Sequence, residues 1–247
     1  MCHMIYKINL NQSKKIRIIM LHGWQEDNKI FSPLLESLHD YELLLFDLPG
    51  FGHSPAPNEA IGSAGYSRMI YHEICKLPNK PSIFIGHSFG TRLALQIAAH
   101  SNYPILGLIL LATTGIIQER NLIYRYRSHI IKFLNLLGNY GFNFKLRRMF
   151  LYLLLGREYR KLKQMRHIME IIHTEDLTQL FSKIKQKAIL FHGQYDKHTP
   201  PSLGKKISAH IAHSELFILK NCNHHNIISA GKNDIINSIK ILSYCGD

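Results

Sequence analysis

The sequence is poor in cysteine and contains no long hydrophobic run. Its four cysteines, among 247 residues, form no CxxC pair, so we expect reduced thiols rather than a disulfide framework. The longest apolar segments lie at residues 105–112 and 149–155, and both are far shorter than the roughly 18–20 residues of a transmembrane helix. The first ten residues lack the basic start and the apolar run of a signal peptide. We therefore expect a cytoplasmic protein without a transmembrane segment.

Acidic residues are also scarce. The chain has 17 Asp and Glu against 30 Lys and Arg, which gives a net charge of +13 with histidine neutral. Twelve Lys and Arg but only three Glu fall between residues 119 and 170, so most of the excess lies in about a fifth of the chain. Such a local excess favours attraction to an anionic partner, such as an acidic protein, or to an anionic lipid surface. The sequence has no recognisable nucleic-acid-binding module, so we expect no nucleic-acid partner.

Strand-like and helix-like segments alternate along most of the chain. The expected strands are short and apolar on both faces, as in a buried parallel sheet. They span residues 16–21, 42–47, 82–86, 105–111, 187–191 and 215–219, with residues 5–10 as a further edge strand. Helix-like segments lie between them at residues 31–38, 66–76, 91–100 and 203–211. This alternation predicts an α/β fold with a mostly parallel sheet covered by helices.

The alternation stops between residues 113 and 174, where only helical stretches occur. About 60 residues are few for a domain with a core of its own, and strand-like segments resume afterwards. We therefore expect a helical cap, residues 113–174, inserted into one α/β core made of residues 1–112 and 175–247. Residues 149–155 are apolar all round, which fits a cap helix packed on the core or the wall of an acyl-chain pocket.

The strongest chemical signal is the motif Gly86-His87-Ser88-Phe89-Gly90, which follows a predicted strand and precedes a predicted helix. In this G-x-S-x-G context the serine sits on a tight strand-to-helix turn with its hydroxyl exposed, and the glycines remove side chains that would collide. Ser88 is therefore the candidate nucleophile. The backbone N–H of Phe89, at the start of the helix, faces the position where an oxyanion forms.

A second glycine turn, Leu21-His22-Gly23-Trp24, follows the first central strand directly. The flexible glycine lets the next backbone N–H turn inward, so Trp24 is the candidate for the second oxyanion-hole donor. The alternative is an ordinary strand-to-helix turn, which the accompanying Ser88 motif disfavours.

Four motifs together resemble the α/β-hydrolase superfamily. They are HGW at residues 22–24, DLPGFGHS at residues 47–54, GHSFG at residues 86–90 and FHGQYDKHTP at residues 191–200. The resemblance covers nearly the whole chain outside the expected cap, and it implies the α/β-hydrolase fold and the catalytic order Ser, acid, His. It also implies that Asp196 is the catalytic acid, which orients the imidazole and stabilises its charged form, and that Asp47 has a packing role.

The catalytic histidine has two candidates in the segment Asn223-His224-His225-Asn226. Members of the superfamily usually place Gly-His shortly after the last strand, and here Asn223 stands in place of the glycine. Counting forward from the strand at residues 215–219 selects His224, whereas counting back from a terminal helix, indicated by the spacing of Ile235, Ile239 and Leu242, selects His225. We favour His224, because the strand end fixes where the loop enters the site, and keep His225 as the alternative base.

These residues predict a serine hydrolase that cleaves a small-molecule carboxylic ester through an acyl-enzyme, without a cofactor. The sixteen histidines form no HExxH motif or matching carboxylate cluster, so we expect no metal site. HGW and DLPGFG also resemble the pimeloyl-carrier-protein methyl ester esterases of biotin synthesis, and a basic cap suits an anionic substrate or an acidic acyl carrier protein. The same residues are compatible with hydrolysis of an amide or a C–C bond, and the same scaffold with a non-catalytic binding protein.

Overall fold

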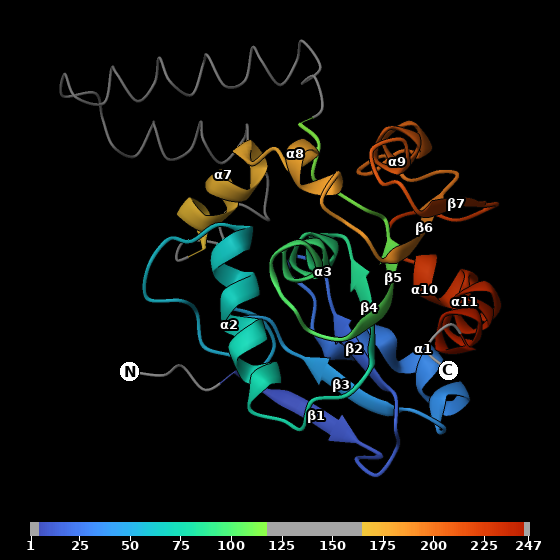
Figure 1. The fold of residues 1–247 in the computed structure, drawn as a ribbon. Coiled ribbons are helices and arrows are strands. Elements are labelled where there is room, and N and C mark those ends of the chain that lie inside the picture. The colour runs from blue at the N-terminus through green and yellow to red at the C-terminus, as the bar shows by residue number, and fades with distance from the viewer. Residues whose placement is uncertain (1–4, 118–164, 245–247) are drawn as a thin grey trace, which may run out of the picture.

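The predicted α/β fold is present in the computed structural model, which describes residues 5–117 and 165–244 (Figure 1). Its strands are β1 (Lys7–Leu10), β2 (Arg17–Leu21), β3 (Glu42–Phe46), β4 (Ser82–His87), β5 (Ile105–Leu111), β6 (Lys187–Gly193) and β7 (Ser214–Leu219). The helical segments are η1 (Asn28–Phe31), α1 (Ser32–Leu35), η2 (Glu36–Leu38), α2 (Ser63–Cys75), α3 (Phe89–His100), α7 (Arg166–Thr174), α8 (Thr178–Phe181), α9 (Pro201–Ser208), α10 (Ile227–Ala230) and α11 (Lys232–Tyr244).

The strands form one sheet in the order β1-β3-β2-β4-β5-β6-β7. The edge strand β1 runs antiparallel to β3, and the other strand pairs are parallel. The order reverses at β2, because β3 pairs with one side of β2 and β4 with the other. Open parallel sheets bind ligands beyond the carboxyl ends of the strands at such a reversal. Leu21 of β2 lies opposite Gly86 of β4, so the fold brings the HGW and GHSFG motifs together at the carboxyl ends of these two strands.

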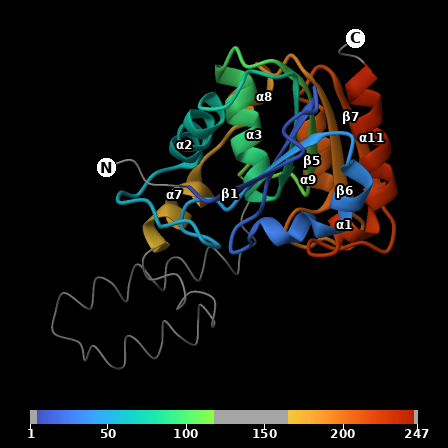
Figure 2. The same cartoon turned by 90° about the horizontal axis from the view of Figure 1, so that it is seen from below.

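Alternate strand residues enter two apolar clusters on opposite faces of the sheet. In β2, Ile19 and Leu21 belong to one cluster, and Ile18 and Met20 belong to the other. Helices α2, α3 and α9 contribute to the first cluster, and α11 contributes to the second. Figure 2 shows α2 and α3 on one side of the sheet and α1 and α11 on the other. Because both faces are covered, the middle of each central strand is apolar on both sides.

One predicted helix is divided in the structure. The sequence predicts a single helix over residues 31–38, but η1, α1 and η2 follow one another there. Asp27 caps η1 by accepting a hydrogen bond from the backbone N–H of Lys29 at 2.9 Å. The N–H of Ser32 donates to the carbonyl of Lys29, and Pro33, at the start of α1, has no N–H with which to continue a regular α-helical pattern.

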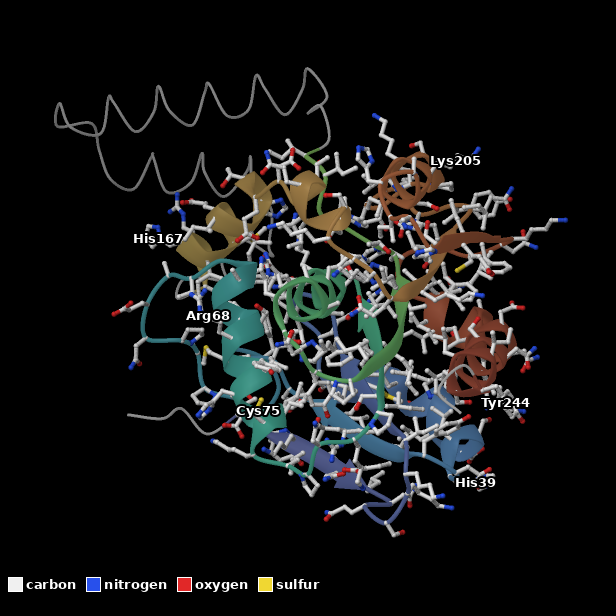
Figure 3. The ribbon with its side chains drawn as sticks, viewed as in Figure 1. His39, Arg68, Cys75, His167, Lys205 and Tyr244 are labelled. Atoms are coloured by element: carbon white, nitrogen blue, oxygen red, sulfur yellow. The ribbon has the colours of Figure 1, made fainter. Side chains whose placement is uncertain are left out.

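Two of the four cysteines lie in the described residues, and both are free thiols. Cys75 is exposed at the end of α2 (Figure 3), whereas Cys222 is buried. Burial raises the pKa of the Cys222 thiol to about 11, so it stays protonated at neutral pH. Within residues 5–117 and 165–244, no helix has the length and apolar character needed to cross a membrane.

Candidate active site

Ser88 occupies a strained turn between β4 and α3. Its backbone angles are φ 48° and ψ −109°, a combination that residues with a side chain rarely adopt. The flanking glycines permit this turn. A Cβ on Gly86 would lie 2.7 Å from backbone atoms of Thr91, and one on Gly90 would collide with the carbonyl group of Leu21. The turn therefore has the geometry that its G-x-S-x-G sequence predicts.

His224 connects Ser88 with Asp196. Its Nε2 lies 3.2 Å from Ser88 Oγ, and its Nδ1 lies 2.7 Å from Asp196 Oδ2. An ionised carboxylate can only accept a hydrogen bond, so Nδ1 carries the proton and Nε2 is free to accept from the serine hydroxyl. Ser88 follows β4, Asp196 follows β6 and His224 follows β7. Three separate turns thus bring these side chains together at the carboxyl edge of the sheet.

Asp196 is buried and surrounded by donors. Its Oδ1 accepts from the backbone N–H groups of His198 and Thr199, both at 2.8 Å, and its Oδ2 accepts from the Thr199 hydroxyl at 2.6 Å. Burial alone raises the pKa of Asp196, but the hydrogen bonds from His224 and Thr199 outweigh it and lower the pKa to about 2. Asp196 is therefore ionised at neutral pH.

Thr199 lies within the motif at residues 191–200, but the sequence alone gives no indication of its role. It holds the acid through both its backbone N–H and its hydroxyl. Its position three residues after Asp196 is the signal that identifies it in retrospect, because Asp side chains commonly accept from backbone N–H groups two or three residues further on.

His225 is not one of the residues that link Ser88 to Asp196. It is exposed, and its backbone N–H donates to the side chain of Asn223 at 2.9 Å. The structure places His224 rather than His225 within hydrogen-bond distance of Ser88. Counting back from the terminal helix selects the other histidine because a short helix, α10, stands between this loop and α11. The left-handed backbone conformation in the loop belongs to Asn221, with φ 53°, and not to Asn223.

Three histidine rings gather beside the site without forming a metal centre. The ring centroids of His198 and His224 lie 5.2 Å apart, and those of His224 and His225 lie 5.6 Å apart. In the part of the chain that the structure describes, no group of three or more His, Cys, Asp or Glu side chains could hold a metal ion.

The two predicted oxyanion residues are neighbours. The rings of Trp24 and Phe89 meet edge to face with their centroids 5.4 Å apart. The turn before Trp24 is held by the buried His22, whose Nε2 accepts from the N–H of Leu48 at 2.8 Å and whose Nδ1 donates to the carbonyl of Gly23 at 2.7 Å. Burial lowers the pKa of His22, which keeps the ring neutral for this pair of contacts.

Asp47 supports the neighbouring loops. Its carboxylate is fully buried and accepts from the backbone N–H groups of Asn28 and His53, both at 2.9 Å. Burial alone raises the pKa of Asp47, but these hydrogen bonds outweigh it and lower the pKa below its ordinary value. The contacts agree with the packing role that the sequence resemblance implies.

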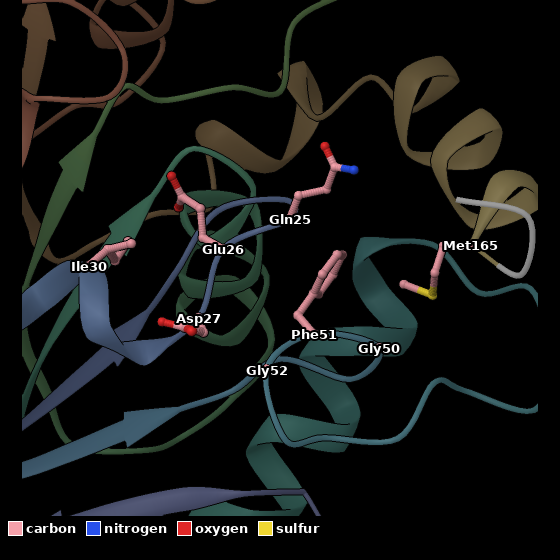
Figure 4. A pocket seen from close by; sticks show the side chains of 8 residues that line it. All are labelled: Gln25, Glu26, Asp27, Ile30, Gly50, Phe51, Gly52 and Met165. Carbon is pink, nitrogen blue, oxygen red and sulfur yellow. The ribbon is translucent and has the colours of Figure 1, made fainter. Parts of the chain in front are cut away.

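A cavity of about 550 Å³ adjoins the candidate site (Figure 4). It is lined by Gln25, Glu26, Asp27, Ile30, Gly50, Phe51, Gly52 and Met165. Ser88 and His224 are not lining residues, so the cavity does not contain the nucleophile. Glu26 belongs to the cavity wall and also contacts His87, the residue before Ser88. The cavity therefore borders the turns that build the site.

Most of the predicted cap lies outside the described residues. These exclude residues 118–164, and with them the apolar segment at 149–155 and every Lys and Arg of the basic region except Arg166. The described end of the region is α7, which buries Ile168 and Ile172 against the core cluster that also contains α2 and α3. The boundaries of the cap at residues 113 and 174 stay a prediction.

Comparison with known proteins identifies similar chains. A family model described as the alpha/beta hydrolase fold matches residues 16–155. The chain is 32% identical over 103 residues to a pimeloyl-[acyl-carrier protein] methyl ester esterase of Shewanella woodyi, a match that spans 42% of this chain and 38% of that protein. A protein of the same name from Nitrosomonas europaea is 23% identical over 233 residues, which cover 86% of this chain and 90% of that protein.

Solved structures show the same architecture. An alpha/beta hydrolase enzyme from a Medee basin deep-sea metagenome library superimposes with a TM-score of 0.73 at 19% identity. The match covers 96% of this chain and 93% of that one, so the likeness of the fold extends over nearly the whole of both chains.

Proposed function

The chain belongs to the alpha/beta hydrolase fold family, and from this premise we propose that it is a serine hydrolase that cleaves carboxylic esters. The observation that carries the proposal is the series of contacts from Ser88 Oγ to His224 Nε2, at 3.2 Å, and from His224 Nδ1 to Asp196 Oδ2, at 2.7 Å. A nucleophile, a base and an orienting carboxylate within hydrogen-bond reach of one another are the arrangement that activates a serine hydroxyl.

The reaction follows from the roles of these groups. His224 takes the proton of Ser88 at Nε2 as Oγ attacks the ester carbonyl carbon, and the carbonyl electrons move to the oxygen. The backbone N–H groups of Trp24 and Phe89 stabilise that oxyanion. His224 then gives the proton to the leaving alcohol, and the acyl group stays on Ser88. Water, deprotonated by His224, attacks the acyl-enzyme, and His224 returns that proton to Ser88 Oγ as the carboxylic acid leaves.

Asp196 acts through His224. Its carboxylate is ionised at neutral pH because its pKa is about 2, and it accepts the Nδ1 proton of His224. This contact keeps Nε2 free to act as the base and stabilises the imidazolium that forms during the reaction.

Hydrolysis of p-nitrophenyl esters of increasing acyl length tests the proposal. We expect turnover by the wild type and a loss of at least about a thousandfold in kcat for Ser88→Ala and for His224→Ala. His225→Ala is the matched control, because it removes a neighbouring exposed imidazole that does not reach Ser88, and its kcat should stay within about threefold of the wild type. The preferred acyl length measures the size of the acyl site.

One result would overturn the proposal, and another would change the residue assigned as its base. Folded wild-type protein that hydrolyses no ester and whose Ser88 does not react with a fluorophosphonate would favour a non-catalytic binding protein on the same scaffold. Loss of activity in His225→Ala but not in His224→Ala would reassign the base.

A narrower substrate, a pimeloyl methyl ester carried on acyl carrier protein, is the second candidate. The named relatives from Shewanella woodyi and Nitrosomonas europaea favour it. So does the net charge of +13, because a basic protein attracts an acidic carrier over long range. The chain matches only 38% of the length of the Shewanella protein, so the carrier-bound substrate is proposed for this chain and not carried over from that relative.

The salt dependence of kcat/KM distinguishes an esterase for the carrier-bound substrate from a general esterase. We expect kcat/KM for the carrier-bound ester to exceed that for free methyl pimelate at low ionic strength and to fall as salt is added, because salt screens the attraction between the proteins. Equal kcat/KM for carrier-bound and free esters at every salt concentration would count against the carrier-bound substrate and leave the general esterase.

A further inference from the structure

Glu26 and His87 form a contact pair where three turns of the candidate site meet. Glu26 Oε2 accepts from the backbone N–H of Gly23 at 2.7 Å and lies 2.7 Å from His87 Nδ1. The other ring nitrogen of His87, Nε2, lies 3.1 Å from the backbone carbonyl oxygen of His224. The pair thus contacts the oxyanion turn at Gly23, the nucleophile turn through His87 itself, and the loop of the catalytic base.

Both ring nitrogens of His87 lie against oxygen atoms. Burial alone raises the pKa of Glu26, but the hydrogen bonds from His87 and Gly23 outweigh it and lower the pKa below its ordinary value, so the carboxylate is ionised and can only accept a hydrogen bond. Glu26 Oε2 and the His224 carbonyl oxygen hold the His87 ring from two sides, and Glu26 and His87 form a largely buried hydrogen-bonded pair.

The contact between Glu26 and His87 is largely shielded from solvent. The His87 side chain is 2% exposed and that of Glu26 is 20% exposed. Glu26, from the turn after β2, contacts the His87 ring directly, and the ring centroid of His224 lies 5.1 Å away. Asp196 lies beyond His224 and is engaged by Nδ1 of that ring. Glu26 is therefore the carboxylate that orients the His87 ring.

A largely buried polar pair of this kind is poorly suited to a purely stabilising role, because removing polar groups from water costs about as much as their hydrogen bonds return. Hydrogen bonds do fix directions, since each donor and acceptor must meet its partner at a set angle. The pair therefore aligns the turns that it contacts.

We infer that Glu26 and His87 are positioning residues that hold the oxyanion turn, the nucleophile turn and the His224 loop in register for the reaction at Ser88. The inference rests on the proposed serine-hydrolase function. Neither side chain is assigned a contact with the ester. Loosening the pair shifts the His224 base and the Trp24 amide relative to Ser88, so the chemical step slows while substrate binding is largely kept. A displacement of about 1 Å can cost about a hundredfold in rate.

The test compares Glu26→Gln, His87→Gln and the double variant with Glu42→Gln. The control breaks a buried ion pair elsewhere in the sheet, because Glu42 Oε1 lies 2.9 Å from Arg17 Nε and both side chains are 1% exposed. That pair sits at the amino ends of β2 and β3, at the opposite edge of the sheet. Kinetics with a p-nitrophenyl ester are measured well below the unfolding temperature of each variant.

We expect kcat to fall about 10- to 100-fold in Glu26→Gln and in His87→Gln, with KM within about twofold of the wild type. The double variant should lose no more than the worse single variant, because the two residues act as one unit. Glu42→Gln should lower the unfolding temperature while kcat stays within about twofold. Unchanged kcat in both single variants, or an equal loss of kcat in Glu42→Gln, would overturn the positioning role.

Nitrogen NMR tests the contact between Glu26 and His87 in the folded protein. In protein labelled with [15N]histidine, Glu26→Gln should shift the ring-nitrogen signals of one histidine, the one whose signals are missing in His87→Gln. Unchanged signals would overturn the contact. A wild type that neither turns over ester nor reacts with a fluorophosphonate overturns the proposed function and the positioning role together, whereas an active wild type with unaffected variants overturns the positioning role alone.

Discussion

At the scale of single residues, Asp196 shows how hydrogen bonds determine the charge of a buried carboxyl group. Only 3% of the residue is exposed, and burial alone favours the neutral acid. The contacts from His224, His198 and Thr199 supply four donors to its two oxygens. These donors favour the ionised form, and the pKa falls from 3.8 to about 2.

Asp196→Asn should lower stability in a way that depends on pH. A carboxyl whose pKa is lower in the folded state stabilises the fold above its unfolded pKa and loses that contribution as the pH falls through the folded pKa. The shift from 3.8 to about 2 corresponds to about 2 kcal/mol at pH 7, of which about 1 kcal/mol is lost by pH 3. Urea unfolding of both proteins at several pH values between 7 and 3 measures the difference.

The exposed Asp40, whose side chain is 73% exposed, provides the control. Asp40→Asn should change stability little at any pH, because an exposed charge is well solvated. A stability difference between wild type and Asp196→Asn that stays constant from pH 7 to pH 3 would contradict the assigned hydrogen bonds.

The sequence identifies the residues of the site unequally well. Ser88 has a local signal, because its turn requires glycines at fixed positions. His224 and His225 are harder to separate, since their positions depend on the length of a loop and of α10, which no local pattern in the chain specifies. Glu26 and Thr199 act through partners that fold next to them, and His87 contacts Glu26 across 61 positions of sequence. Contacts of that kind follow from the fold and not from a motif.

At the scale of elements, the turn from β4 to α3 depends on the absence of a side chain at Gly86. A Cβ there would lie 2.7 Å from the backbone N and Cα of Thr91, which cannot move without shifting the first turn of α3. Gly86→Ala should therefore destabilise the protein by about 1–3 kcal/mol and slow the reaction of Ser88 with a fluorophosphonate. Urea unfolding and timed labelling test this. Wild-type stability with wild-type labelling would show that the turn tolerates a side chain.

The strands are predicted better than the short helical segments, for a physical reason. Each central strand is covered on both faces, so the middle of the strand is apolar on both sides, and this leaves a short continuous run in the sequence. The segment from Asn28 to Leu38 has no such constraint. Its three short pieces are set by the cap at Asp27 and by Pro33, which break a pattern that otherwise resembles one helix. The alternation of apolar residues predicts that an element exists more reliably than it predicts where the element ends.

At the scale of the whole molecule, Glu175 joins the end of α7 to the nucleophile turn. Its carboxylate accepts from the backbone N–H of Ser63 at 2.7 Å and from Arg92 Nη1 at 3.2 Å. Arg92 Nε donates to the hydroxyl of Thr114 at 3.0 Å, and that hydroxyl donates to the carbonyl of Ser88 at 3.4 Å. The segment that returns from the predicted cap is therefore connected to the turn that carries the nucleophile.

Glu175→Gln should weaken both the fold and the nucleophile turn. The substitution removes the charge that balances Arg92, whose side chain is 8% exposed, and a lost hydrogen bond to a charged group costs about 2 kcal/mol. Because the contacts continue through Thr114 to the carbonyl of Ser88, the rate of Ser88 labelling by a fluorophosphonate should fall a few-fold as well. Urea unfolding and timed labelling measure the two effects.

Glu170→Gln is the matched control on the same helix. Glu170 Oε1 lies 3.1 Å from Arg166 Nε, but both side chains are substantially exposed, at 55% and 37%, so its loss should cost no more than about 0.5 kcal/mol and leave labelling unchanged. A larger effect of Glu175→Gln on both measurements would mean that the returning segment is built into the nucleophile turn, so that the predicted cap could not be removed without disturbing Ser88. Equal effects of the two variants would instead mean that α7 packs on the core as an independent surface element.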